Sequence, residues 1–302
     1  VIGAFVLTFF PGEGAFDWKW YRAFALSSSL LVLIGIIDDR HGMPAAVKLA
    51  GQVLVAVLLF FAKDSGMGTL LGHTVPWWVD LGVWVIWTVG IINAFNLIDG
   101  MDGLCAGLAT ISLGALAIIS LVGGNTVDGL IMIGLVGALL GFLRYNFHPA
   151  RIFLGDTGSM FIGLAIASAA TTSAGERAVA VSILLPLLVA GIPLFDVVLA
   201  VWRRSARRFL GGLGVGKAAK IFGADREHLH HRLLDLGLTQ RKVASLLYAL
   251  ALAATVLAMV PSIFDERALG ITVSAVFVAG LLGLRYLAPV ELHTSGKVLD
   301  MV

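Results

Sequence analysis

The sequence predicts an all-α, polytopic integral membrane protein, and two observations, its composition and the pattern of its apolar runs, support this fold class. The 302 residues are 59% hydrophobic and 13% charged, with a mean hydropathy of +0.95, far from the composition of a soluble domain. The apolar residues occur in long runs that do not alternate with polar ones, which excludes a transmembrane β-barrel. The single cysteine, Cys105, excludes an internal disulfide framework.

The apolar runs predict about ten transmembrane helices within a single domain, residues 1–302. Most runs are near or above the length needed to cross roughly 30 Å of hydrocarbon. The chain opens inside an apolar run without an initiator methionine, so we expect the natural N-terminus to lie upstream. The runs are approximately 1–10, 24–37, 46–62, 77–92, 105–123, 128–143, 158–174, 178–202, 242–260 and 268–288. Cytoplasmic loops that form the active site are expected at about 38–47, 93–105, 144–157 and 203–241.

The basic residues predict the orientation of these helices. Threading the chain back and forth through ten spans places sixteen of its 21 lysines and arginines on one side, which is therefore the cytoplasmic side. The sequence pI is about 8.8, but membrane orientation explains the basic residues better than nucleic-acid binding does, so no nucleic-acid partner is expected. The lipid bilayer is the partner that the composition itself predicts.

Five aspartates next to apolar runs all fall on the predicted cytoplasmic side. A carboxylate at bilayer depth costs roughly 2.5–3.5 kcal/mol, so such residues usually face a partner, an ion or a watery cavity. Converging carboxylates repel one another unless a cation neutralises them, and a divalent metal that handles phosphates would do so. The five are Asp38, Asp39, Asp99, Asp102 and Asp156.

Asp38 and Asp39 are adjacent at the end of one run. On a helix, adjacent side chains point about 100° apart, so the two cannot hold one ion in the same way. We expect one to ligate or to hydrogen-bond while the other acts as a base. The alternative is an acidic pair at the membrane interface, offset by Arg40.

Asn93, Asn96 and Asp99 follow one another at intervals of three residues, which places three oxygen-bearing side chains along one helical face. The glycines that follow would loosen the helix and present Asp102 from a turn. Carboxylate and amide oxygens are the ligands that Mg²⁺ takes while it keeps waters for phosphate oxygens. A polar seam between helices is the alternative.

Asp156 lies among glycines and hydroxyl residues where a further apolar run begins. Asp156 or Thr157 could cap the first free N–H groups of that helix, and the same N–H groups bind a phosphate when one is present. Capping alone is the alternative.

Three histidines lie between Arg226 and Arg232 in the largest cytoplasmic loop. His228 and His231 have a spacing that zinc ligands can have, but no cysteine or third clear ligand accompanies them. Histidines and arginines that bind phosphate or sugar hydroxyls fit this segment better, and a solvated basic loop is the alternative.

The order of these motifs resembles one family, the polyprenyl-phosphate N-acetylhexosamine-1-phosphate transferases of the glycosyltransferase 4 type. The resemblance covers roughly residues 31–242. Its last motif, His228 to His231, looks like the bacterial undecaprenyl-phosphate N-acetylglucosaminyl-1-phosphate transferases, because the muramoyl-pentapeptide branch typically carries three consecutive histidines followed by Phe-Glu. The family's first span and the loop after it would precede Val1.

The resemblance implies a role for each candidate residue. Asp156, helped by Asn96, would hold Mg²⁺, or Mn²⁺ in its place. Catalysis would depend on Asp38, Asp39 and His230. The substrate-binding residues would be Lys48 near the pyrophosphate, Asp102 and Phe153 near uracil, and Asn93, Asp99, Arg226, His228 and His231.

The implied reaction transfers N-acetylglucosamine 1-phosphate from UDP-N-acetylglucosamine to undecaprenyl phosphate and releases UMP. It would be the first membrane step of O-antigen, teichoic acid or similar polysaccharide synthesis, at the cytoplasmic face of a bacterial inner membrane. A homodimer is compatible with the family. Direct attack is expected, with a covalent phospho-aspartate as the alternative. The alternative functions are a phospho-N-acetylmuramoyl-pentapeptide transferase, an ion-coupled transporter and an intramembrane aspartyl protease.

Overall fold

The computed structural model describes residues 17–62, 69–70, 73–74, 76–173, 191, 233–235 and 237–263. These residues form long helices and one short hairpin. In the hairpin, the two-residue strand β1 (Thr69–Leu70) pairs antiparallel with the two-residue strand β2 (His73–Thr74). The predicted all-α, polytopic class is confirmed. The apolar runs 1–10, 178–202 and 268–288 lie outside the described residues. The helices are α2 (Trp18–His41), α3 (Ala45–Ala62), α4 (Trp77–Ile98), α5 (Leu104–Val122), α6 (Thr126–Asn146), α7 (Gly155–Ser173) and α11 (Gln240–Ile263).

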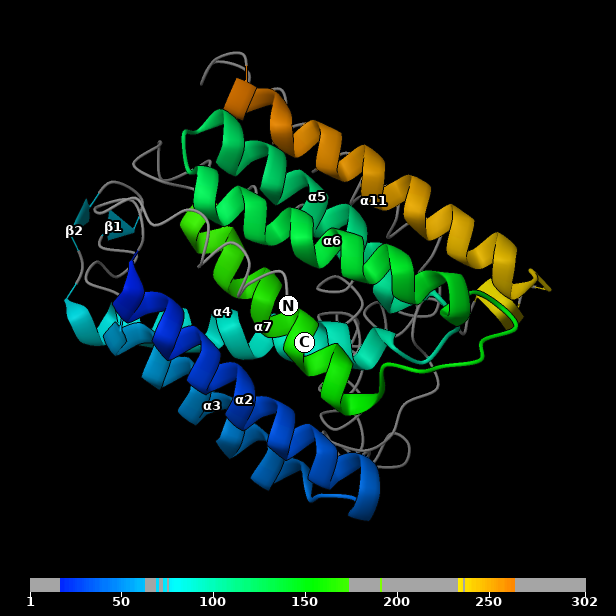
Figure 1. Ribbon diagram of the computed structural model, residues 1–302, viewed down its shortest axis with the longest axis horizontal. Helices are drawn as coiled ribbons and strands as arrows, with labels where there is room; N and C mark the ends of the chain where they lie inside the picture. The colour runs from blue at the N-terminus through cyan, green and yellow to red at the C-terminus, as the bar shows by residue number, and fades with distance from the viewer. Residues whose placement is uncertain are drawn as a thin grey trace, which may run out of the picture.

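Six of these helices are long and apolar enough to cross a membrane: α2 to α6, and α11 over Gln240–Leu257. Helix α7 is not among the six, because its 19 residues include glycines, serines and threonines. It lies instead among the other helices, where it packs against α2, α4 and α5, and its residues 162–170 are all buried. Figure 1 shows α7 between the α2–α3 pair and the layer formed by α5, α6 and α11. A less apolar helix is tolerated there because protein, rather than lipid, surrounds it.

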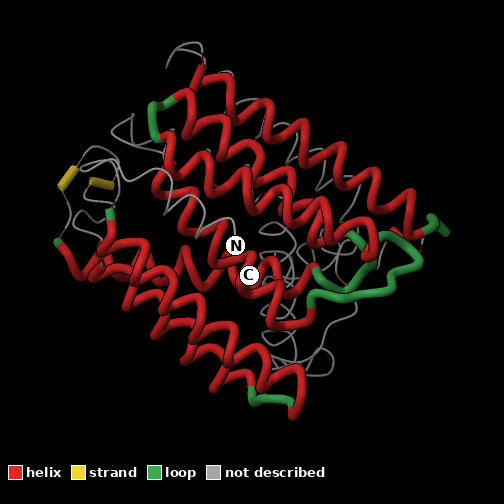
Figure 2. The backbone as a smooth tube through the Cα atoms, in the orientation of Figure 1, coloured by secondary structure: helices red, strands yellow, loops and turns green. Residues whose placement is uncertain are grey.

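Successive helices run in opposite directions, so the same end of the bundle carries the end of α4 and the starts of α5 and α7. The loops that join α4 to α5 and α6 to α7 lie at this end, while the β1–β2 hairpin lies at the other end (Figures 1 and 2). Alternate threading therefore predicts correctly which connections share an end of the bundle. All five aspartates belong to the end that carries these loops.

Two clusters of buried apolar side chains hold the helices together. One joins α2 and α3 to α4 and α7, with Leu31, Leu59 and Trp84 fully buried. The other packs α5 between α6 and α11, with Leu247 of α11 buried, and also includes residues of α4 and α7, among them Phe95. Helices α4 and α7 contribute to both clusters. The middle of the bundle is therefore the structure on which the site is built.

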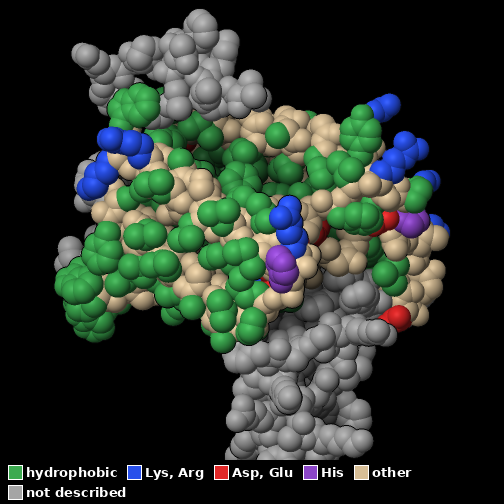
Figure 3. Space-filling view, turned by 60° about the horizontal axis from the view of Figure 1, so that its bottom comes forward, with side chains coloured by type: hydrophobic (Ala, Val, Ile, Leu, Met, Phe, Trp, Pro, Cys, Tyr) green, Lys and Arg blue, Asp and Glu red, His purple; other side chains and the backbone are tan. Residues whose placement is uncertain are grey.

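The outer surface of the helices is apolar. Leu26 is 73% exposed and Ile86 is 76% exposed, as expected for side chains that face lipid tails. Figure 3 shows apolar side chains over much of the visible face, with charged side chains in small groups. Trp77 and Trp78, at the start of α4, are also exposed, in keeping with the preference of tryptophan for the headgroup region.

Gly35 allows α2 to approach α7 closely near the end of the bundle that carries the five aspartates. A Cβ atom at Gly35 would lie 2.8 Å from the backbone nitrogen of Thr157, so a larger side chain would force the two helices apart. Small residues allow close backbone contact between membrane helices in this way. The approach brings Asp38 and Asp39, one turn beyond Gly35, against the beginning of α7.

Candidate active site

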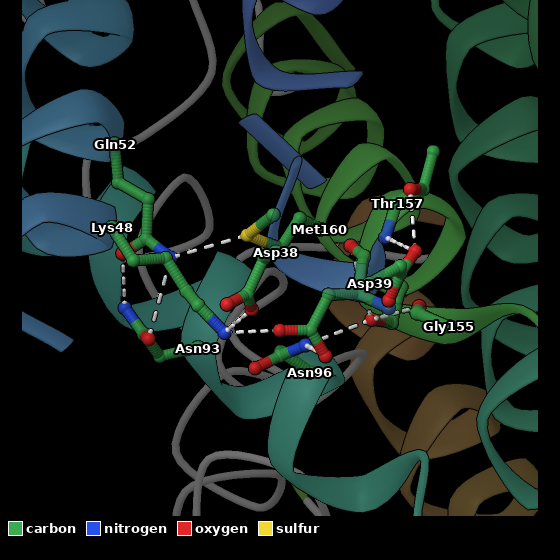
Figure 4. Close-up of polar contacts among 11 residues, drawn as sticks. Asp38, Asp39, Lys48, Gln52, Asn93, Asn96, Gly155, Thr157 and Met160 are labelled. Carbon is green, nitrogen blue, oxygen red and sulfur yellow. Dashed lines mark hydrogen bonds and ion pairs between the residues drawn. The ribbon is translucent and has the colours of Figure 1, made fainter. Parts of the chain in front are cut away.

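Asp39 caps the N-terminus of α7 from a different helix. Its carboxylate accepts hydrogen bonds from the backbone N–H of Asp156 at 2.8 Å, from the N–H of Thr157 at 3.1 Å and from the Thr157 hydroxyl at 2.6 Å (Figure 4). The first N–H groups of a helix have no partner within the helix, and a negative charge there is favoured by the helix dipole. The sequence suggests Asp156 or Thr157 as the cap, whereas the acceptor comes from α2. Both oxygens of Asp39 are therefore engaged in fixing α7.

Asp38 has a different environment, because its partner is Lys48 at the start of α3. The Lys48 ammonium forms ion pairs with Asp38 and with Asp156, and Figure 4 shows the Lys48 side chain directed toward Asp38. The side chains of Lys48 and Asp38 are only 18% and 10% exposed. Their mutual attraction is therefore screened less than that of surface charges. Lys48 thus offsets the repulsion between two carboxylates that come from different helices.

Asn96 fixes the other oxygen of Asp156. Its Nδ2 donates to Asp156 Oδ1 at 3.0 Å and to the Ser159 hydroxyl at 3.0 Å. Asp156 therefore receives the amide of Asn96 on one oxygen and the ammonium of Lys48 on the other, while its own N–H is held by Asp39. The two residues predicted to hold the metal, Asp156 and Asn96, lie in direct contact.

Asn93 lies one turn further into the bundle and does not line the pocket described below. Its Nδ2 donates to Gln52 Oε1 at 2.6 Å and to the Val89 carbonyl at 2.8 Å, and Gln52 Nε2 lies 3.4 Å from Asn93 Oδ1. Gln52 is fully buried, four residues after Lys48 on α3. Its signal in the sequence is an amide within an apolar run, next to the site lysine. The substrate-binding role of Asn93 stays a prediction.

A pocket of about 260 Å³ opens beside these carboxylates. One wall is the α4–α5 turn, with Asp99 and Asp102, and the opposite wall is the segment from Phe153 to Asp156. Phe153 is 72% exposed, so its ring is available for a ligand to stack on. The lining residues are Asn96, Asp99, Gly100, Met101, Asp102, Asn146, Phe153, Gly155 and Asp156.

Asp99 is the carboxylate of this pocket whose charge is least compensated. Burial, together with the negative charges of Asp156 and Asp39, raises the pKa of Asp99 to about 7. None of the described residues donates a hydrogen bond to its carboxylate. Perturbed carboxyl groups of this kind gather at functional sites, where substrates or cations alter their charge.

One oxygen of the Asp102 carboxylate is already bonded to other residues of the protein. Its Oδ2 accepts from the backbone N–H of Ala150 at 3.1 Å and lies 2.8 Å from Nδ1 of His148, so His148 donates here. These contacts join the α4–α5 turn to the α6–α7 loop. Sequence reasoning missed His148 and Asn146. Their signal is the polar segment between two apolar runs, immediately before Phe153.

The donor chemistry of the site fits Mg²⁺ bound by few protein ligands. No group of three or more His, Cys, Asp or Glu side chains in the described part of the chain is arranged to hold a metal ion. Mg²⁺ usually binds through one or two carboxylates and keeps positions for water and phosphate oxygens. Asp156 supplies a carboxylate, and the side-chain amide of Asn96 contacts it through Nδ2.

Four predicted site residues belong to the segment before α11 that the sequence predicts to be a loop. Arg226, His228, His230 and His231 lie outside the described residues, so their roles stay predictions.

Together, these features define a polytopic membrane protein with a carboxylate-lined pocket at one end of the helix bundle. Residues 21–174 match the model of glycosyl transferase family 4. The chain is 33% identical over 256 residues to the probable undecaprenyl-phosphate N-acetylglucosaminyl 1-phosphate transferase of Bacillus subtilis, covering 82% of this chain and 68% of the relative. The chain therefore belongs to glycosyl transferase family 4, as the order of its motifs predicts.

Two further relatives are similar over shorter shares of their length. The decaprenyl-phosphate N-acetylglucosaminephosphotransferase of Mycobacterium leprae is 36% identical over 255 residues, 75% of this chain and 61% of the relative. The phospho-N-acetylmuramoyl-pentapeptide-transferase of Desulforudis audaxviator is 37% identical over 195 residues, 57% of this chain and 58% of the relative.

Proposed function

We propose that the protein transfers N-acetylglucosamine 1-phosphate from UDP-N-acetylglucosamine to undecaprenyl phosphate, releasing UMP and leaving undecaprenyl-diphospho-N-acetylglucosamine in the membrane. The observation that carries this proposal is the Lys48 ammonium held between Asp38 and Asp156 beside a pocket at the ends of membrane helices. The names of the Bacillus and Mycobacterium relatives support the sugar and the class of lipid acceptor. The corresponding location is a bacterial inner membrane, with the pocket on the cytoplasmic side.

The reaction exchanges one phosphoanhydride for another, so it needs no ATP. An oxygen of the lipid phosphate forms a bond to the β-phosphorus of the nucleotide sugar, and the bond between that phosphorus and the UMP oxygen breaks. The main barrier is the approach of two anions, which positive charge and fixed geometry lower. When bound at Asp156 and Asn96, Mg²⁺ would neutralise phosphate oxygens and stabilise the UMP leaving group.

The protein's own residues would have separate roles in the reaction. Lys48 would draw phosphate oxygens toward the carboxylate cluster. Asp38 is better suited than Asp39 to take the proton of a monoanionic lipid phosphate, because both oxygens of Asp39 are bonded to α7. Phe153 would stack on the uracil and Asp102 would hydrogen-bond to it, each from one wall of the pocket. Arg226 and the histidines of the large loop would bind the sugar and diphosphate.

The test is the exchange of labelled UMP into UDP-N-acetylglucosamine by membranes that contain the protein. Asp156→Ala should reduce this exchange by about 1,000-fold, because it removes the carboxylate that Lys48 and Asn96 hold in place. Asp235→Ala, which removes an exposed carboxylate near the start of α11, is the matched control and should exchange at the wild-type rate. Substantial exchange by Asp156→Ala would remove Asp156 from the reaction.

The same membranes identify the substrate. Mass spectrometry of the lipid product formed from a panel of UDP-sugars separates N-acetylglucosamine from its galacto epimer and from the muramoyl pentapeptide. Chelation by EDTA should stop the reaction, and Mg²⁺ or Mn²⁺ should restore it. A lipid product that carries a different sugar phosphate would correct the substrate, while formation of no lipid product would overturn the proposed class of reaction.

A further inference from the structure

The backbone of Gly103 is held from two sides by side chains of distant helices. Gly103 ends the α4–α5 turn, where its φ of 76° suits glycine and strains other residues. Its N–H donates to Asn146 Oδ1, at the end of α6, at 3.1 Å. Its carbonyl accepts from the Tyr248 hydroxyl of α11 at 2.6 Å. The N–H and the carbonyl of Gly103 are therefore each bonded to a side chain of a distant helix, and the carbonyl also accepts the Gly107 N–H at 2.9 Å.

The turn that Gly103 ends forms one wall of the pocket, with Asp99, Gly100, Met101 and Asp102. A turn that contains two glycines has many accessible conformations, so its geometry depends on such anchors. Fixing Gly103 limits the directions in which the carboxylates of Asp99 and Asp102 can point.

Asn146 also holds the opposite wall. Its Nδ2 donates to the Ile152 carbonyl at 2.8 Å, immediately before Phe153. Asn146 is 4% exposed, and both ends of its amide are bonded to backbone groups of the two walls. The width of the pocket is therefore set in part by one amide side chain.

Helix α11 braces the same two loops. The ring of Tyr248 occupies space beside Gly107, where a Cβ atom would run into it. Seven residues earlier on α11, Arg241 donates through Nη2 to the His148 carbonyl at 3.1 Å. Tyr248 is not among the residues that line the pocket. Its hydroxyl can therefore affect a ligand only through the turn that it holds.

We propose that Asn146 and Tyr248 are positioning residues that act through Gly103 to set the distance and orientation of the two pocket walls for the nucleotide sugar. This inference rests on the proposed function, because it assigns the nucleotide sugar to that pocket. It adds α11, which follows the large cytoplasmic loop, to the structure that determines nucleotide affinity.

The decisive variant is Tyr248→Phe, which keeps the ring beside Gly107 and removes only the donor to Gly103. The KM for UDP-N-acetylglucosamine should rise about fivefold, the effect of one hydrogen bond, while kcat stays within about twofold. The KM for the lipid phosphate should not change. Tyr145→Phe is the matched control, because it also removes a tyrosine hydroxyl, here from a half-exposed residue next to Asn146 at the end of α6. A KM for UDP-N-acetylglucosamine that equals the control value overturns the proposal.

Hydrogen–deuterium exchange gives a second readout that does not depend on turnover. Peptides that cover residues 99–104 should exchange faster in Tyr248→Phe than in Tyr145→Phe, and faster still in Asn146→Ala, which removes the acceptor of the Gly103 N–H. If the wild-type protein transfers no sugar phosphate, the proposed function is wrong, and the exchange data alone decide the inference. Unchanged exchange would then overturn the positioning role, and faster exchange would support it.

Discussion

The two sides of the site differ in how far the charges of their carboxylates are compensated by other residues. On the side formed by α2, α3 and α7, Asp39 is bonded to the N-terminus of α7, and Asp38 and Asp156 share the ammonium of Lys48. On the side formed by the α4–α5 turn, Asp99 is largely buried and faces negative neighbours, which raise its pKa to about 7. The first side is compensated within the protein. The second side has a negative charge that a cation or a proton can still compensate.

This difference indicates how the site can keep its geometry when the charge in the pocket changes. Fixed ion pairs and a helix cap hold the first side in one geometry, and so they preorganise it. The second side carries a carboxyl group whose charge depends on what enters the pocket. Three changes test whether this division is correct.

The largest effect is expected for Lys48→Met, which leaves Asp38 and Asp156 facing each other without a cation. The rate of labelled-UMP exchange should fall about 100-fold, because both the repulsion between the carboxylates and the loss of a charge for the phosphates raise the barrier. Arg144→Met removes an exposed basic side chain from the last turn of α6 and is the control. A rate for Lys48→Met similar to that of Arg144→Met would show that the ion pairs do not contribute to the reaction.

An intermediate effect is expected at Asp39. Asp39→Ala removes the three hydrogen bonds that the carboxylate accepts at the start of α7, and should lower the free energy of unfolding by about 1–2 kcal/mol. The exchange rate should fall about tenfold, because a displaced Asp156 no longer meets its partners. Asp39→Asn keeps one of the two acceptor oxygens and should recover part of both quantities.

Asp38→Asn is the matched comparison for Asp39→Asn. It removes a charged partner of Lys48 and should not recover activity, although it too conserves shape. If Asp39→Asn is stable but as inactive as Asp38→Asn, Asp39 has a chemical role that capping does not explain.

The third change tests the other side of the site, through a pH dependence of stability from Asp99. Its pKa is raised from 3.8 to about 7 in the folded protein, so the folded state binds the proton more tightly than the unfolded state. The stability from this group is complete below about pH 4 and is lost as the pH rises toward 7, by up to about 1.4 kcal/mol per pH unit. Asp99→Asn should abolish this loss, so its advantage over the wild type should grow between pH 5 and pH 7.

Thermal unfolding of the two proteins in detergent and EDTA measures this difference without competition from divalent cations. A constant difference in Tm across that pH range would mean that Asp99 ionises normally in the fold.

Sequence reasoning predicted the site in outline because its signals are local. A carboxylate beside an apolar run is costly in any fold, which singled out Asp156 and Asp99. The spacing of Asn96 predicted its place on a helical face toward the acids. The roughly 100° between Asp38 and Asp39 predicted two different jobs but not their assignment, since no local signal says which acid meets the start of α7. Asn93 has the same local signal as Asn96, yet its amide is bonded to Gln52.

Hydropathy, helix length and the excess of lysine and arginine on one side determined by themselves that this chain is an all-α membrane protein with five aspartates at one end. Each of these properties can be read along the chain without knowing which residues lie close together in space. The tertiary structure alone decided that Asp39 caps α7, that Lys48 joins Asp38 to Asp156, and that Tyr248 holds Gly103. Those partners are separated by 117, 108 and 145 residues, so only the packing of the helices brings them together.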